Sequence, residues 1–142
     1  MIRHVAGIAE VVEDVAFAVR FYTDVLGLSV EHQEGSGYAV VDIPGVLHFG
    51  IWSRREAAEA TFGDPQATDR IPLGFSVGFE VDDVEESNRA MSAAGTNFLQ
   101  TPKEEPWKQV TSRFNSTSGA LCDISSTPRA RSITQQMRVS EG

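Results

Sequence analysis

Hydrophobic and polar positions along the chain predict the same succession of elements twice. An apolar strand-like stretch, an acidic residue and an amphipathic helical pattern follow one another in residues 5–27 and again in residues 73–95. Asp14 and Asp83 each stand where a side-chain oxygen can cap the helix that follows. A glycine ends each helical pattern, as is common at helix C-termini. The sequence therefore predicts an internal repeat, which fixes the architecture before any other feature is considered.

Three short strands are expected after each of the two helices. Turn residues separate the apolar stretches, and Ser53 with Glu56 forms a capping box that predicts a further short helix over residues 57–61. The expected strands are residues 28–33, 38–43 and 46–52 in the first copy, and 96–100, 109–115 and 120–125 in the second. Each copy therefore has the order βαβββ.

The first helix carries a stripe of large apolar residues. Phe17, Phe21 and Val25 recur at four-residue spacing, with Ala18 and Tyr22 beside them. This spacing predicts that the stripe is the face that packs on the sheet.

The repeat defines the expected domain organisation and the fold class. We expect one α+β domain over residues 1–126, with module one at 1–53, a linker at 54–72 and module two at 73–126. Residues 127–142 are polar and show no periodicity, which is typical of a flexible tail. Two modules placed side by side, or swapped between subunits, form open, curled mixed sheets around a cavity with the helices outside.

Composition narrows the location and the partners of the protein. The chain has 142 residues, of which 41% are hydrophobic, and its net charge is −8, which argues against nucleic acid or an anionic membrane as a partner. A single cysteine, Cys122, excludes an internal disulfide and a cysteine-based metal site. No apolar run is long enough to cross a bilayer, and the first residues lack a signal-peptide pattern. We expect a cytoplasmic protein.

These motifs resemble those of the vicinal oxygen chelate superfamily. Asp14 with the run FYTDVLGL at residues 21–28, the run GFEVDDV at residues 78–84, and Pro106-Trp107 before a strand are similar to its signatures. That superfamily contains glyoxalase I, extradiol dioxygenases, fosfomycin-resistance enzymes and bleomycin-resistance proteins. The resemblance implies the fold; it implies much less about function, because one scaffold hosts many chemistries.

The resemblance also implies where a metal ion would be held. Enzymes of the superfamily bind a divalent metal ion through two positions in each module, and the metal acts as a Lewis acid. Seven residues before the capping aspartates stand Gly7 and Ser76, and the positions on the last strand of each module correspond to His48 and Asp123. Glycine offers no side-chain ligand and serine is a poor one. We expect no metal; if one is bound, His48 and Asp123 are its ligands.

Glu10 has a position that alternation does not explain. With Gly7, Ala9 and Val11 facing the cavity, Glu10 points under the helix, where an unpaired carboxylate is costly. Either the strand bulges and turns Glu10 into the cavity, or its carboxylate reaches an arginine.

Alternation and the resemblance together give a set of candidate ligand-binding residues. These residues supply polar contacts, an aromatic wall, an aromatic loop at the pocket mouth and a cation. The cation, Arg113, either meets an anionic group of a ligand, pairs with Glu80, or is simply solvated. The full set is His48, Trp52, Ser76, Glu80, Trp107, Arg113 and Asp123.

The sequence favours a metal-free protein that binds and sequesters an aromatic or antibiotic-like small molecule, similar in character to the bleomycin-resistance branch. We expect a homodimer with pockets at or near the subunit junction. One alternative is a metal-dependent lyase, isomerase or dioxygenase that uses His48, Asp123 and either Glu10 or Glu80. Others are a metal-free acid–base enzyme with Glu80 or His48 as base, and an interaction module with an empty pocket. Whether the protein is an enzyme stays open.

Overall fold

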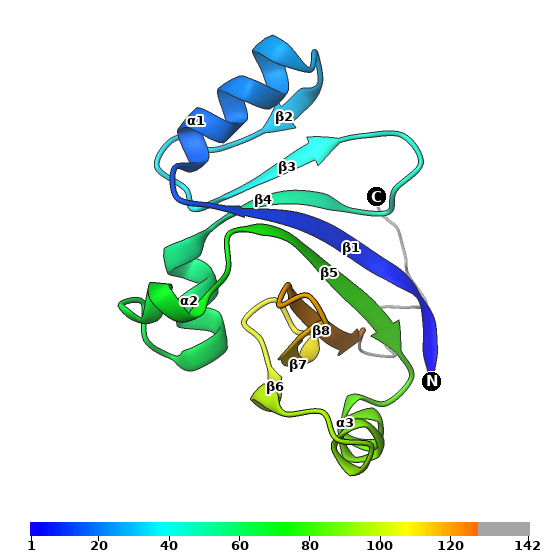
Figure 1. Ribbon diagram of the computed structural model, residues 1–142. Coiled ribbons are helices and arrows are strands. Elements are labelled where there is room, and N and C mark those ends of the chain that lie inside the picture. The colour runs from blue at the N-terminus through cyan, green and yellow to red at the C-terminus, as the bar shows by residue number, and fades with distance from the viewer. Residues whose placement is uncertain (128–142) are drawn as a thin grey trace.

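A computed structural model describes residues 1–127, which form one curled mixed sheet with two of its three α-helices, α1 and α3, on its outer side (Figure 1). The expected α+β fold of two βαβββ modules is confirmed. The expected tail lies outside the described residues, apart from Thr127. The first half contains β1 (Ile2–Val12), α1 (Val15–Arg20), η1 (Phe21–Val25), β2 (Ser29–Glu31), β3 (Tyr38–Asp42), β4 (Phe49–Ser53), α2 (Arg54–Phe62) and η2 (Ala67–Arg70). The second half contains β5 (Gly74–Val81), α3 (Val84–Ala93), β6 (Phe98–Glu104), β7 (Val110–Asn115) and β8 (Leu121–Ser126).

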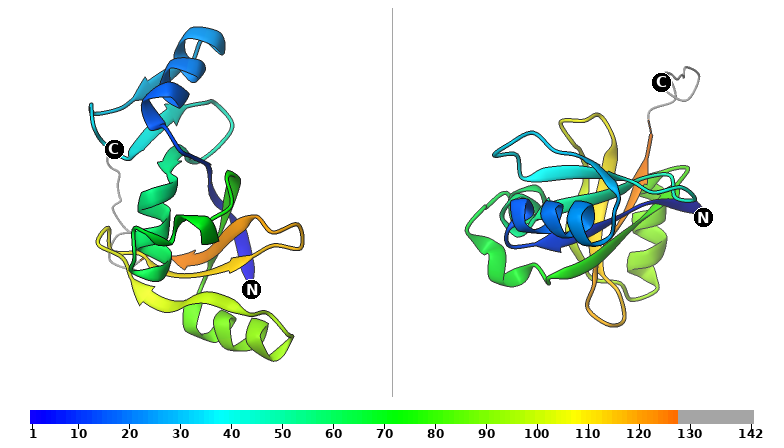
Figure 2. Two further views of the ribbon diagram at one scale, coloured as in Figure 1. Left: turned by 60° about the vertical axis from the view of Figure 1, so that its left-hand side comes forward. Right: turned by 90° about the horizontal axis from the view of Figure 1, so that it is seen from above.

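The two modules join through their first strands. The sheet order is β2-β3-β4-β1-β5-β8-β7-β6, and β1 pairs antiparallel with β5 at the centre. Within each module the first strand also pairs in parallel with the last, as β1 with β4 and β5 with β8. Figures 1 and 2 show that the sheet curls, so that its two halves flank one concave side.

The helices begin at the capping residues that the sequence predicts. The backbone N–H of Phe17 donates to Asp14 over 3.0 Å, and that of Glu86 donates to Asp83 over 3.1 Å. Ser53 accepts from the backbone N–H of Glu56 in the same way, and α2 that follows is longer than expected. These bonds satisfy N–H groups that a helix N-terminus otherwise leaves unpaired.

The prediction for the first helix is wrong about which stripe is buried. The large apolar residues Phe17, Phe21 and Val25 are 64%, 46% and 66% exposed. The buried face instead carries Val15, Ala18 and Tyr22, which pack in a cluster with strand residues of β3 and β4. The helix has two apolar faces, and the smaller side chains of Val15 and Ala18 let it approach the sheet more closely.

Glu10 is neither in the cavity nor paired with an arginine. It keeps the orientation that alternation gives, under the helix, where its carboxylate accepts a 2.6 Å hydrogen bond from the Tyr22 hydroxyl. Burial and this carboxylate together raise the pKa of Tyr22. The bulges of β1 lie earlier in the strand, between Ile2 and His4 and between Val5 and Gly7.

A central hydrophobic cluster joins both modules to the segment between them. Val11 of β1, Ala57 and Ala58 of α2, Ile71 and Leu121 of β8 are all buried and in contact. The segment expected to be a linker therefore closes one end of the concave side. None of the helices within residues 1–127 is long and apolar enough to cross a membrane.

Candidate functional site

The concave side of the sheet contains a cavity of about 700 Å³ between the two modules. Strand register builds its floor: Gly7 of β1 lies opposite Gly78 of β5, Gly78 opposite Asp123 of β8, and Asp123 opposite Arg113 of β7. The two adjacent glycines let the side chains of His48 and Asp123 lie close over the sheet. The lining residues are Ala6, Gly7, Ile8, Ala9, Tyr38, His48, Trp52, Glu56, Ser76, Gly78, Trp107, Gln109, Thr111, Arg113, Asp123 and Ser125.

One wall of the cavity is a stacked and hydrogen-bonded pair. The rings of Tyr38 and His48 are nearly parallel, with centroids 5.9 Å apart, and the Tyr38 hydroxyl bonds the His48 Nε2. Burial raises the pKa of Tyr38 to about 12. Although His48 as a residue is exposed, loss of hydration around the ring lowers its pKa. The pair is therefore a neutral hydrogen-bonding unit near pH 7.

The opposite wall carries Asp123, a half-buried residue of β8 whose carboxyl group faces the cavity. A Cβ added at Gly78 would lie 2.8 Å from Asp123 Oδ1, so the carboxylate leans over the glycine floor. The pKa of Asp123 is raised to about 6, mainly by burial against the opposing effect of Arg113, with smaller contributions from the negative charges of Glu105 and Glu80. Among residues 1–127, no side chain donates a hydrogen bond to it or forms an ion pair with it.

Arg113 does not offer its charge to the cavity, because a buried network satisfies it. Its Nη1 donates to Glu105 over 2.8 Å and also to the side-chain oxygen of Gln100. The Glu105 carboxylate, 1% exposed, accepts from the Thr111 hydroxyl as well. The guanidinium lies 5.5 Å from the centre of the Trp52 ring. A buried charge pair of this kind needs such additional hydrogen bonds to be tolerated.

The structure brings six of the seven sequence-predicted site residues to this one cavity. Glu80 is the exception: it points past the end of the floor, where its carboxylate accepts from the backbone N–H of Thr127 over 3.2 Å. Arg113 pairs with Glu105 rather than with Glu80 or a free anion. Trp107 is 47% exposed, and its indole N–H donates to Gln109 at the rim. Asp123 is a cavity group and not a solvated edge residue.

Sequence reasoning missed the buried partners of Arg113, Gln100 and Glu105, and five polar residues that line the cavity: Tyr38, Glu56, Gln109, Thr111 and Ser125. Tyr38 lies directly opposite Trp52 on the neighbouring strand, a pairing that the irregular connection between β3 and β4 hides from the sequence. Glu105 stands beside Glu104 in a charged run that is typical of a solvated turn. The available signal was the Pro106-Trp107 turn, which folds β6 and β7 into a hairpin and brings residue 105 near Arg113.

The strand register also identifies where the metal ligands of the fold would stand. Ala9 and Gly78 are equivalent in the repeat, five residues before their capping aspartates. Ala9 lies opposite Gly50 and Gly78 lies opposite Asp123, so the equivalent of Asp123 is Gly50 and not His48. The four positions are therefore Gly7, Gly50, Ser76 and Asp123.

This donor set does not fit a divalent metal ion. It offers one carboxylate and one hydroxyl, whereas working sites use three or four nitrogen, oxygen or sulfur ligands. A Cβ added at Gly50 would collide with the Tyr38 hydroxyl, so that side chain fills the space of the missing ligand. Within residues 1–127, no three His, Cys, Asp or Glu side chains are grouped so that they could hold a metal.

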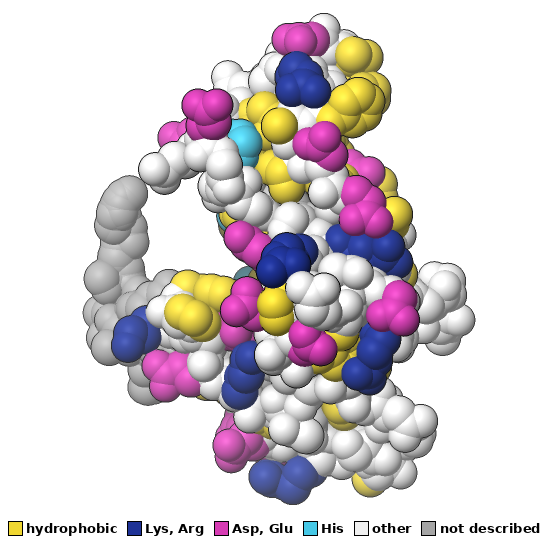
Figure 3. Space-filling view, turned by 90° about the vertical axis from the view of Figure 1, so that its left-hand side faces the viewer, with side chains coloured by type: hydrophobic (Ala, Val, Ile, Leu, Met, Phe, Trp, Pro, Cys, Tyr) yellow, Lys and Arg dark blue, Asp and Glu magenta, His cyan; other side chains and the backbone are white. Residues whose placement is uncertain are grey.

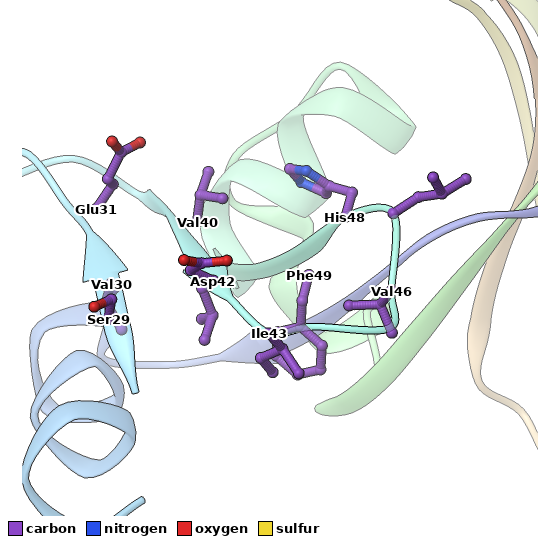
Figure 4. Close-up of a pocket in the computed structure, with 11 residues that line it drawn as sticks. Ser29, Val30, Glu31, Val40, Asp42, Ile43, Val46, His48 and Phe49 are labelled. Atoms are coloured by element: carbon purple, nitrogen blue, oxygen red, sulfur yellow. The ribbon is translucent and has the colours of Figure 1, made fainter. Parts of the chain in front are cut away.

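A second, smaller pocket of about 380 Å³ adjoins the cavity at His48. Figure 4 shows His48 and Val40 on one side of the β3–β4 hairpin, and Ile43 and Phe49 on the other. Glu31 and Asp42 also line this pocket. Its position beside His48 makes it an extension of the cavity toward the sheet edge.

Comparison with known proteins identifies the class to which this fold and cavity belong. The sequence model of the Glyoxalase/Bleomycin resistance protein/Dioxygenase superfamily matches residues 2–124. The chain therefore belongs to that superfamily. Among curated proteins, none matches the chain in sequence.

Solved structures with the same fold share little sequence with the chain. Methylmalonyl-CoA epimerase from Mycobacterium tuberculosis is 16% identical, with a TM-score of 0.63 and coverage of 94% of this chain and 93% of the epimerase. An NAD-dependent benzaldehyde dehydrogenase from Legionella pneumophila is 17% identical, with a TM-score of 0.60 and coverage of 86% and 98%. A superfamily member from Vibrio splendidus 12B01 is 16% identical, with a TM-score of 0.56 and coverage of 89% and 99%. At these identities the likeness extends to the fold alone.

Proposed function

We propose that the protein binds a small aromatic or antibiotic-like molecule in the cavity between its modules, without a metal ion, and sequesters it. The observation that carries this proposal is the loss of ligands at three of the four metal positions, Gly7, Gly50 and Ser76, in a cavity that stays large enough for a ligand. Trp52, Tyr38 and Trp107 supply aromatic surface around the cavity. This is the kind of function that proteins of the bleomycin-resistance branch have. We propose that the protein exercises it in the cytoplasm.

The test combines metal analysis with ligand screening. Protein purified without chelator should contain far less than one divalent metal ion per chain, and a thermal-shift screen of aromatic antibiotics and related compounds should find stabilising ligands, because a ligand that binds the folded state raises Tm. Ser76→Phe fills the cavity floor and should abolish the shift, whereas Ser92→Phe on the exposed surface of α3 should not. Stoichiometric metal that disappears in Asp123→Ala would refute the proposal.

A metal-free acid–base reaction is the second candidate, and Asp123 is the residue that favours it. A carboxyl group with a pKa of about 6 can accept or return a proton near neutral pH, and the Tyr38–His48 pair stands on the opposite wall. The sequence pointed to Glu80 or His48 as the base; for this candidate function we propose Asp123 instead, because it lines the cavity and Glu80 does not. A ligand recovered chemically changed by the wild-type protein but unchanged by Asp123→Asn would favour the enzyme.

The proposed assembly is a homodimer. The exposed side chains of Phe17, Phe21 and Val25, with Phe75 of β5 at 54% exposure, leave apolar surface on the helix side of the sheet. Figure 3 shows hydrophobic side chains gathered at the end of the molecule that α1 forms. Because this surface is on the other side of the sheet from the cavity, such a dimer has two separate cavities, not pockets at the junction.

A further inference from the structure

The charges that line the cavity do not balance. Asp123 and Glu56 present carboxylates to it, and neither forms an ion pair within residues 1–127. Arg113 is the one lining residue among these with a permanent positive charge, and Glu105 neutralises it from outside the cavity. The Tyr38–His48 pair contributes hydrogen-bonding groups without charge. An arriving ligand therefore meets uncompensated negative charge.

Arg113 lines the cavity, but its guanidinium points toward Glu105, so its charge is not available to a ligand. Arg113 lies directly across the β7–β8 ladder from Asp123, the position from which it could pair with that carboxylate. Its guanidinium turns instead toward Glu105, Gln100 and the Ala60 carbonyl, and its side chain is 5% exposed. This arrangement withdraws the cation and leaves the Asp123 carboxylate over the Gly78 floor without a donor. A half-buried carboxylate without a protein donor can form a charge-assisted hydrogen bond with a cationic group that binds beside it.

We propose that the cavity selects ligands that carry a protonated amine next to an aromatic group, with the amine donating to Asp123 and the aromatic group lying against Tyr38 and Trp52. This inference rests on the proposed binding function and names its ligand class. Anionic ligands are disfavoured, since Arg113, the one lining residue within residues 1–127 with a permanent positive charge, is already bonded to Glu105. The selectivity separates this protein from relatives of the fold that hold acyl-CoA compounds, such as the methylmalonyl-CoA epimerase solved with methylmalonyl-CoA.

Three naphthalene probes of matched shape test the inference: 2-naphthylmethylamine, 2-naphthalenemethanol and 2-naphthoate. Binding to the full chain is measured by ligand-observed NMR titration at about pH 8. The amine should bind roughly 10- to 100-fold more tightly than the naphthoate, the range expected for a charge-assisted hydrogen bond at a half-buried carboxylate. In Asp123→Asn this preference should disappear while the alcohol binds as before.

The control variant is Asp69→Asn, which removes the same charge from the exposed η2 turn and should leave all three affinities unchanged. Equal binding of amine and naphthoate, or a preference that survives in Asp123→Asn, overturns the inference but leaves the proposed binding function intact. If none of the probes binds, the inference also falls, and the compound screen with Ser76→Phe decides the binding function separately.

Discussion

At the scale of single residues, the carboxyl groups of Asp123, which is half-buried, and Glu105, which is buried, have opposite roles. Glu105 is matched by Arg113, Gln100 and Thr111, so its charge is satisfied and part of the framework. Asp123 has no such partners within residues 1–127, so its carboxylate remains able to accept a hydrogen bond from a ligand. The missing partners lower the stability of the folded protein. Polar groups without a protein partner are typical of positions that are shaped by function rather than by packing.

Replacing Asp123 by asparagine should stabilise the protein above pH 6. The folded state raises the pKa of this carboxyl from 3.8 to about 6, so between these values the folded protein holds a proton that the unfolded chain has released. The free energy of unfolding therefore falls as the pH rises through this window, by up to about 3 kcal/mol. Denaturant unfolding of wild type and Asp123→Asn should show a gain for the variant at pH 8 that shrinks toward pH 4. Parallel pH profiles would contradict this account.

Replacing Glu105 by glutamine should have the opposite effect on stability and should change ligand preference. The variant leaves the Arg113 guanidinium buried without a counter-charge, which costs about 3 kcal/mol. The same change gives the cavity an uncompensated cation, so 2-naphthoate should bind more tightly relative to 2-naphthylmethylamine. Denaturant unfolding and the probe titrations measure the two effects. Glu104→Gln, on the exposed neighbour, is the matched control and should change neither.

At the scale of elements, α1 shows how far sequence patterns determine packing. Its N-terminal cap at Asp14 follows from local chemistry and was predictable. Its orientation was not, because Phe17, Phe21 and Val25 make as good an apolar stripe as Val15, Ala18 and Tyr22. The choice depends on how closely the helix approaches β3 and β4, which is a property of the assembled sheet.

The exposed stripe of α1 and η1 should form the dimer contact. Phe21→Glu places a charge in the middle of the stripe Phe17, Phe21 and Val25 and should weaken self-association at least about tenfold, since central aromatic residues carry much of the binding energy of interfaces. Analytical ultracentrifugation over a concentration series measures the change. Ala90→Glu introduces the same charge on the exposed surface of α3 and should leave association unchanged. A monomeric wild type, or equal association of both variants, would exclude this contact.

At the scale of the whole molecule, the repeat predicts the cavity but only part of its contents. Counting from Asp14 and Asp83 locates Gly7 and Ser76 from sequence alone. The equivalence of Asp123 with Gly50 requires the strand register, because the connection between β3 and β4 differs in length from that between β7 and β8. The Arg113–Glu105 pair likewise depends on how β6 and β7 align, with bulges that no local pattern reveals. The pairing of strands that are distant in the chain cannot be predicted from local sequence patterns.

The same non-local pairing should make the two modules unfold together. β1 hydrogen-bonds to β4 of its own module and to β5 of the other, and Val11 and Leu121 share one buried cluster with α2. Neither module can separate without exposing that cluster to water. Trp52 and Trp107 report on module one and module two, so Trp107→Phe and Trp52→Phe each leave one local probe. For each variant, the fluorescence midpoint in denaturant should coincide with the circular dichroism midpoint. A fluorescence transition displaced from circular dichroism in either variant would show that the modules are independent, and a cavity between independent modules could not hold Asp123 and the Tyr38–His48 pair at a fixed separation.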